Sequence, residues 1–521
     1  MAPRKGIKPL SVGILLTAVT LLVPMTSTAQ FMASKESLSD LYPGKAYSPY
    51  AQRAFPSMPL WGDTHLHTGL SVDAGLFGAR LGLDDAYRFA RGEEVISSTG
   101  QPVKLARALD WLVIADHSDG MGLVDDLASA SPNVTKFEQG KRWSDGMRAG
   151  GETAVETALD LITNFSQGNV DPDLLAAYSP GSKGYASVWK KVVEAAEDFN
   201  DPGNFTSLIG FEWTSLVEGN NLHRNVIFRG GKYNADTIIP FSNFDSFDPE
   251  DLWAWMQRYE DNTQDRLLAI PHNGNLSNGM MFALQDDFDG GKPLDREYAA
   301  RRARWEPLYE MTQIKGDGEA HPFLSPNDEF ADYETWDKGN LDLTALKKDE
   351  MLAGEYAREA LKRGLMLEEK LGTNPYKFGM VGATDSHTGL ATAQEDNFFG
   401  KHSGVEPEPH RWEHTVISSP LDPDLAIMGW QQVASGLAAV WAKDNTREAL
   451  FDAMARKEVY ATTGTRMAVR VFAGWDFTAE EVHRPDFART GYTRGVPMGG
   501  DLRQVSDSAA PTFMIRALRD P

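Results

Sequence analysis

Short apolar runs that end in clusters of polar residues recur along most of the chain. These runs cover residues 60–62, 109–115, 207–211, 267–271, 308–314 and 378–383. Helical patterns lie between them, over residues 84–90, 186–199, 249–259 and 350–371. Strands that alternate with helices indicate an α/β fold with a mostly parallel sheet. If such a sheet closes into a barrel, the polar ends of its strands meet on one face.

Three segments fall outside this alternation. Residues 133–178 have helical patterns broken by loops, which predicts an insertion over about residues 133–205. Residues 466–472 and 511–517 have strand patterns, which predicts a small β appendage over residues 466–521. At the amino end, basic residues, an apolar run over residues 10–25 and small residues before Ala29 predict a signal peptide over residues 1–29. We therefore expect an arm over residues 30–59, a barrel over residues 60–465, and a periplasmic or secreted protein that leaves the membrane once it is cleaved near Ala29.

The composition limits which metal sites, nucleophiles and binding partners the chain can have. The 521 residues include no cysteine, which excludes disulfides, thiolate metal sites and a cysteine nucleophile. Any metal ion must then be held by His, Asp, Glu or neutral oxygen ligands. The formal net charge of −23 disfavours binding to nucleic acid. The oligomeric state does not follow from the sequence.

Histidines and acids gather at the carboxyl ends of the apolar runs. His65 and His67 alternate along one strand, so both imidazoles can reach one cation, although a lone His-x-His pair is equally well explained as two ordinary polar residues. The equivalent ends of the other runs carry His117 beside Asp116, Glu212, His272, Asp385 and His387. More than four ligands implies more than one ion, and a carboxylate such as Glu212 can bridge two. Nitrogen and oxygen donors without sulfur favour zinc, manganese or iron, and we expect two to three divalent ions.

Further candidates lie nearby. Residues 207–215 and 222–229 predict a hairpin that brings His223 close to Glu212 across the turn. Asp73 is either a further carboxylate ligand or a solvated loop acid. Lys315 and Arg224 lie on segments that enter the same face, where a cation could clamp an oxyanion. Five other histidines fit surface or structural roles: His321, His402, His410, His414 and His483.

The order of these motifs resembles the PHP superfamily, named for polymerase and histidinol phosphatase. The matching motifs are Asp63-Thr64-His65-Leu66-His67-Thr68, Ala115-Asp116-His117, Gly210-Phe211-Glu212, Pro271-His272-Asn273 and Asp385-Ser386-His387-Thr388. The resemblance covers about residues 60–390 and implies a distorted barrel of seven strands and helices with a trinuclear metal centre. The export signal, the long insertions and the β appendage resemble a periplasmic branch catalogued as a domain of unknown function, whose members look like alkaline phosphatases.

Carrying the family pattern over implies three ion sites. The implied ligands are His65, His67, Glu212 and Asp385 for one ion, Glu212, His223 and His272 for the second, and Asp73, His117 and His387 for the third. Asp73 stands where many members have His, which leaves that site open to a harder metal.

The expected activity is hydrolysis of small phosphate esters, most simply as a phosphomonoesterase of the alkaline phosphatase type. Clustered divalent ions lower the pKa of bound water and neutralise phosphoryl oxygens, so Glu212 and Asp385 would serve catalysis by holding them, with Lys315 and Arg224 as cationic groups. Three alternatives stay open: a phosphodiesterase that uses the same site, a barrel amidohydrolase, which also begins with His-x-His but needs a bridging lysine, and a non-catalytic periplasmic protein that binds metal or glycan.

Overall fold

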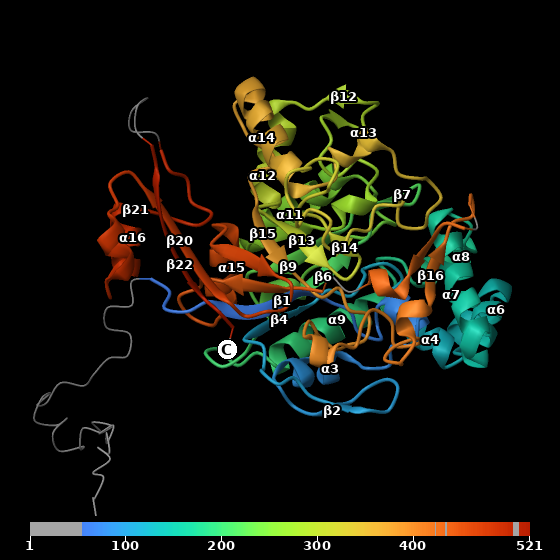
Figure 1. Cartoon of the computed structure of the whole chain (residues 1–521). Coiled ribbons are helices and arrows are strands. Elements are labelled where there is room, and N and C mark those ends of the chain that lie inside the picture. The colour runs from blue at the N-terminus through green and yellow to red at the C-terminus, as the bar shows by residue number, and fades with distance from the viewer. Residues whose placement is uncertain (1–54, 423, 433–434, 504–509, 521) are drawn as a thin grey trace, which may run out of the picture. The chain divides into compact units, whose positions relative to one another are not determined.

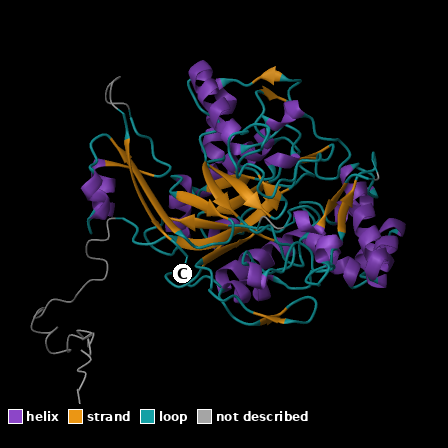
Figure 2. Ribbon diagram, in the orientation of Figure 1, coloured by secondary structure: helices purple, strands orange, loops and turns teal. Residues whose placement is uncertain are grey.

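A computed structural model of the 521-residue chain describes residues 55–422, 424–432, 435–503 and 510–520. The predicted signal peptide and nearly all of the predicted arm lie outside these residues. The described part is a mixed α/β structure in which helices and strands alternate for most of its length (Figures 1 and 2). Among its helices, none has both the length and the apolar character needed to cross a bilayer.

The largest sheet has the strand order β19-β18-β1-β4-β5. Its strands are β1 (Leu60–Leu66), β4 (Trp111–Ile114), β5 (Thr206–Leu208), β18 (Leu437–Val440) and β19 (Val459–Thr462). The strands β1, β4 and β5 run parallel, whereas β18 is antiparallel to β1, with Leu60 opposite Val440. β1 is buried from its second residue to its last, so its polar residues point into the protein.

Two smaller sheets complete the centre of the fold. The first is antiparallel throughout, in the order β10-β9-β6, with β6 (Gly210–Trp213), β9 (Arg224–Phe228) and β10 (Leu267–Pro271). The second pairs β13 (Leu308–Gln313) in parallel with β15 (Gly379–Gly382) and in antiparallel with β14 (Gly316–Asp317). The predicted hairpin is confirmed, but a mostly parallel sheet is wrong, because β9, β18 and β19 each pair antiparallel with their neighbours.

Polar strand ends from different sheets meet through isolated backbone bridges. Leu66 at the end of β1 bridges Ser386 after β15, and His117 after β4 bridges Glu212 in β6. Two buried acids also link the segments that follow these strands. Asp63 accepts hydrogen bonds from the backbone N–H and the hydroxyl of Thr384. Asp116 in turn accepts from the backbone N–H and hydroxyl of Thr68, at 2.6 and 2.7 Å.

Amphipathic helices cover the strands. These helices are α3 (Leu83–Ala90), α9 (Lys183–Asp198), α11 (Pro249–Thr263), α12 (Arg296–Trp305), α13 (Asp349–Leu352), α14 (Ala357–Leu371) and α15 (Arg447–Ala455). α9 begins at Ser182, whose side chain accepts a hydrogen bond from Tyr185 N, and it buries Trp189 and Val193 in the main core. The helix predicted over residues 350–371 is two helices, and Gly354 lies in the break between them, where a Cβ atom would come within 2.2 Å of the carbonyl oxygen of Gly279.

A group of helices after β4 has its own hydrophobic core. It comprises α4 (Leu123–Ala128), α5 (Pro132–Thr135), α6 (Glu138–Ala149), α7 (Gly151–Ser166) and α8 (Pro172–Ala177). Leu127, Trp143 and Leu161 are fully or almost fully buried in this core. The short helix α2 (Val72–Leu76), which follows β1, adds Leu76 to the same core. Residues 133–178 are thus largely helical, as the sequence predicts.

The carboxyl-terminal segment forms a three-stranded sheet in the order β21-β20-β22. Its strands are β20 (Ala468–Gly474), β21 (Gly495–Pro497) and β22 (Thr512–Leu518). Helix α16 (Phe487–Arg494) lies between β20 and β21 in the sequence. Phe472, Phe487 and Met514 form a small core between this helix and the sheet. The strands expected at 466–472 and 511–517 are confirmed to within two residues.

The remaining elements are short. They are β2 (Val95–Ile96), β3 (Pro102–Val103), β7 (Leu216–Val217), β8 (Asn220–Asn221), α10 (Lys232–Ala235), β11 (Gln285–Asp286), β12 (Lys292–Pro293), β16 (Thr415–Ser418) and β17 (Ala426–Met428), together with the 3-10 turns η1 (Gly274–Leu276), η2 (Glu395–Asn397), η3 (Arg411–Glu413), η4 (Gly429–Gln431) and η5 (Ala479–His483).

Candidate metal centre

The structure brings all nine predicted metal ligands into one cluster at the polar strand ends. The nine are His65, His67, Asp73, His117, Glu212, His223, His272, Asp385 and His387. They form overlapping groups in which donor atoms lie within 4.8 Å of one another. Their side chains are almost fully buried, and Asp73 is the most exposed at 21%. Segments more than 300 residues apart therefore supply one site.

Glu212 lies at the middle of the cluster. Its Oε1 atom is 2.7 Å from His223 Nδ1 and 2.8 Å from His272 Nε2. Its Oε2 atom is 3.2 Å from both His67 Nε2 and His117 Nδ1. Burial raises the pKa of this carboxyl, but the surrounding imidazoles, with His117 first, outweigh burial and hold the pKa well below its ordinary value. Glu212 is therefore ionised and faces groups from both sides, as a bridging ligand must.

The first group consists of His65, His67 and Asp385. The two Nε2 atoms are 3.0 Å apart, and Asp385 Oδ1 is 3.4 Å from one and 3.3 Å from the other. His65 Nδ1 faces the Glu310 carboxyl group at 3.1 Å, and burial holds the pKa of His65 well below its ordinary value and raises that of Glu310 well above its own, so the His65 ring is neutral. In the tautomer that donates from Nδ1 to Glu310, Nε2 is left able to bind a cation.

His67 has the same orientation. Its Nδ1 atom is 3.0 Å from Ser71 Oγ, which donates to Asp73 and so accepts a hydrogen bond from Nδ1–H. Both Nε2 atoms of the His-x-His pair then present lone pairs to the same point. Two lone pairs and a carboxylate at this spacing repel one another unless a cation lies between them, so this group fits a divalent ion.

The third group consists of Asp73, His117 and His387. Asp73 Oδ2 is 3.1 Å from His117 Nε2 and 2.6 Å from His387 Nε2. Burial opposes ionisation of Asp73, but the two imidazoles outweigh it and hold its pKa well below the ordinary value. Burial likewise works against His117, yet the carboxylates of Asp73 and Glu212 raise its pKa to about 9. An ion that binds here must displace a proton from His117.

Several buried polar atoms of the cluster have no hydrogen-bond partner among the described residues. They are Glu212 Oε2, His223 Nε2, His272 Nδ1 and Asp385 Oδ1. A buried polar atom without a partner is costly, and native proteins leave few of them. Glu212 Oε2 and Asp385 Oδ1 face the imidazoles of the cluster, so a bound ion could complete them, whereas His223 Nε2 and His272 Nδ1 are the ring nitrogens opposite those that face Glu212.

A model of the family described as "Protein of unknown function (DUF3604)" matches residues 54–521, which is most of the chain. The chain belongs to the DUF3604 family. No curated protein matches it.

Two lysines contact the candidate ligands in this DUF3604 member. Lys315 Nζ contacts Asp385 Oδ2, and Lys401 Nζ lies 2.9 Å from the same oxygen and 2.8 Å from His387 Nδ1. Lys315 is at the position predicted for a cation. Lys401 was not predicted, because a single lysine in a loop with no apolar run before it carries no recognisable signal.

Arg224 does not reach the centre of this DUF3604 member. Its Nε atom donates to Glu306 at 3.0 Å, and its side chain is 1% exposed against Trp213. The expectation that Arg224 clamps an oxyanion is wrong, because successive side chains on a strand point to opposite faces and His223 takes the face toward the metal ligands.

Two further residues at the centre were missed by sequence reasoning. Glu310 is 1% exposed and lies within β13, where a charged residue inside a buried strand was an available signal. Because His65 turns Nε2 toward the first group, Glu310 contacts the opposite side of the ring, where it accepts a hydrogen bond from Nδ1–H and orients the imidazole. The other is Ser71, which lies at the N-cap of α2. Of the histidines expected outside the site, His321 pairs with Asp337 at 2.7 Å, as a structural residue does.

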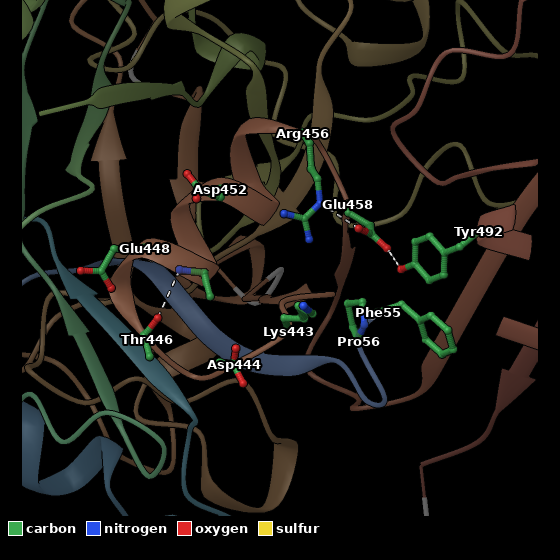
Figure 3. A pocket seen from close by; sticks show the side chains of 11 residues that line it. Phe55, Pro56, Lys443, Asp444, Thr446, Glu448, Asp452, Arg456, Glu458 and Tyr492 are labelled. Atoms are coloured by element: carbon green, nitrogen blue, oxygen red, sulfur yellow. Dashed lines mark hydrogen bonds and ion pairs between the residues drawn. The ribbon is translucent and has the colours of Figure 1, made fainter. Parts of the chain in front are cut away.

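A cavity of the described residues lies elsewhere. It has a volume of about 440 Å³ and is lined by Phe55, Lys443, Asp444, Glu458 and Tyr492, among others (Figure 3). Lys443 and Asp444 follow β18, which is antiparallel to β1, so this cavity lies at the amino end of β1 while His65 and His67 lie at its carboxyl end. No metal ligand lines it.

Replacing Ser71 by alanine is expected to weaken ion binding. The Ser71 hydroxyl donates to Asp73 Oδ1 at 3.1 Å and accepts from His67 Nδ1 and from the backbone N–H of His117 at 3.2 Å. Because it orients ligands of two groups, Ser71→Ala should lower the affinity for the ions they hold by roughly 10- to 100-fold, measured by competition with a chromogenic chelator. Ser144→Ala removes an equally buried hydroxyl that bonds only Leu127 O, and it should leave the affinity unchanged. Equal affinities in the two variants would contradict this role of Ser71.

Proposed function

We propose that this protein is an exported metal-dependent phosphoesterase that acts as a phosphomonoesterase on small phosphate esters. The observation that carries the proposal is the buried Glu212 carboxylate, whose two oxygens face imidazoles of different groups, an arrangement that suits two or three adjacent divalent ions. Such ions, when bound, lower the pKa of water and neutralise phosphoryl oxygens. The absence of sulfur ligands favours zinc, manganese or iron.

Residues of the chain also provide the charges that bound ions and a phosphate ester need. Glu212 and Asp385 offer each ion a negative charge and limit repulsion between neighbouring ions. Lys315 is 12% exposed and Lys401 is 3% exposed, and both amino groups contact one oxygen of Asp385. Burial, with Lys401 next to it, holds the pKa of Lys315 well below its ordinary value, and burial lowers the pKa of Lys401 to about 8. An anionic phosphoryl group bound beside them would favour their protonated forms. Lys315, the more accessible of the two, would bind a phosphoryl oxygen.

The proposal extends to fold and family. We propose that the strands form the distorted seven-stranded barrel of the PHP superfamily, which the sequence motifs resemble. The bridges between Leu66 and Ser386 and between His117 and Glu212 support it, because they join strand ends from separate sheets around one centre. The signal-like amino end supports a periplasmic or secreted location.

The rival functions account for fewer residues. A barrel amidohydrolase needs a lysine that bridges two ions, whereas Lys315 and Lys401 both contact Asp385. It also gives no role to Glu212, which faces imidazoles from every group. A protein that only binds metal or glycan does not need two cations beside the ligands.

A panel of chromogenic substrates tests the proposal. The purified protein is offered a phosphomonoester, a phosphodiester and an anilide, each with added zinc, manganese or iron across neutral and alkaline pH. Release from the monoester at a rate well above that from the diester is the expected result. Release from the diester alone would replace the proposal by a phosphodiesterase, and release from the anilide alone would favour the amidohydrolase. Release from none, with bound metal present, would leave a binding protein.

A further inference from the structure

The short helix α2 carries the candidate metal ligand Asp73 but packs into the core of the helices α4 to α8, which together are the helical insertion. It has five residues, which is too short to be stable alone. Leu76 is 3% exposed and belongs to the hydrophobic core of α4 to α8, and Val72 packs against that same core. This core is distinct from the main core around the central strands. The position of α2 is therefore set by the insertion.

The contact between α2 and the insertion is tight. A Cβ atom at Gly75 would lie 2.4 Å from Val124 Cγ1 on α4 and 2.5 Å from the carbonyl oxygen of Gly69. α2 thus packs closely against the insertion on one side and against the loop that follows β1 on the other. A shift of α4 must move α2, because there is no space between them to absorb it.

The far end of α2 is tied to the loop beside His387. Phe77 O accepts a hydrogen bond of 2.8 Å from Gly404 N, and the Phe77 ring lies 4.6 Å from the ring of His402. The backbone N–H of His387 donates to Lys401 O in the same loop, at 2.9 Å. Asp73 is therefore held between the insertion on one side and the His387 segment on the other.

We propose that the helical insertion sets the affinity of the third ion, by positioning Asp73 through α2. This inference rests on the proposed metal centre. Asp73 is the only carboxylate of the third group, and its Oδ2 atom is within 3.1 Å of both imidazoles. Metal–ligand distances tolerate about 0.2 Å, so a small displacement of α2 weakens this site. The first group takes its ligands from β1 and the segment after β15, and it is linked to α2 through Ser71 at the N-cap, at the opposite end of the helix from Leu76, so it should respond less.

Replacing Leu76 by alanine tests the inference. The readout is the number of ions bound and the affinity of each, measured by native mass spectrometry and chelator competition on the full chain. Asp73→Asn gives the reference for loss of the third site. Leu76→Ala should lower the affinity of the same ion by roughly tenfold or more and change the others by less than about threefold. Leu174→Ala removes the same group from the same core but on α8, so it should lower the melting temperature and leave all affinities unchanged.

The outcomes separate the inference from the proposed function. Wild-type protein that binds no ions would overturn the proposed function itself. Wild-type protein with three ions, and Leu76→Ala with the same three affinities, would overturn the inference alone. Equal losses of affinity for all three ions in Leu76→Ala would also overturn it, since the effect would then be a general loosening of the protein. If Leu76→Ala does not fold, Gly75→Ala keeps the apolar side chains and pushes α2 away from Val124, and it should weaken the same ion.

Discussion

Replacing Glu212 by glutamine is expected to abolish turnover, by about 10³-fold or more, and to remove at least one bound ion. The amide has almost the shape of the carboxylate, but it has no charge and turns a donor group toward imidazole nitrogens. Glu212 Oε1 contacts His223 and His272 within 2.8 Å, so the new side chain would disturb several candidate ligands at once. The measurement combines steady-state turnover of a phosphomonoester with metal analysis of the purified variant.

A matched control is Glu458→Gln, which also removes the charge of a buried carboxylate. Glu458 is 3% exposed, pairs with Arg456 at 2.9 Å and lines the cavity at the other end of β1. This variant should have a lower melting temperature but the wild-type number of ions and wild-type turnover. Full activity in Glu212→Gln, or loss of ions in Glu458→Gln, would be incompatible with a central role for Glu212.

Removing the metal ions with a chelator is expected to abolish activity and to lower the melting temperature, and adding zinc or manganese back should restore both. Without ions, the buried lone pairs of His65 and His67 face each other at 3.0 Å and several donors have no partner. An ion present at 100 times its Kd stabilises the folded state by about 2.7 kcal/mol. Two or three ions should therefore raise the melting temperature by roughly 5–15 °C, measured by calorimetry.

A chelator that lowers activity without changing the melting temperature would indicate ions bound loosely at the surface. Calcium and magnesium serve as the control, because these hard cations prefer oxygen ligands and the cluster offers six imidazoles. They should restore neither activity nor stability. Recovery with magnesium as complete as with zinc would contradict the assignment of the imidazoles as ligands.

Most of the candidate metal centre could be predicted from the sequence, because most of its ligands lie at the ends of apolar strands. Residues at the ends of buried strands meet on one face, which located His65, His67, His117 and Glu212. The hairpin placed His223, which does not follow an apolar run. The period of two along a strand also excludes Arg224 once His223 is a ligand, although that alternation was not applied to it.

Other features depend on packing between distant segments. Glu310 and Lys401 reach the centre from a strand and a loop whose relative positions no local pattern encodes. Ser71 gains its role only because α2 folds back over the end of β1. Strand direction is similarly a tertiary property, since β18 has the same apolar character whether it runs parallel or antiparallel to β1.

The pairing of β1 with the segment after β15 determines when the centre can form during synthesis. Thr384 bonds Asp63 across 321 positions of sequence, and Asp385 N donates to His65 O at 2.8 Å. A nascent chain that exposes His65 and His67 must wait for most of its remaining residues before Asp385 arrives. The first group of candidate ligands therefore assembles late in synthesis, and a polypeptide that ends before Asp385 lacks it.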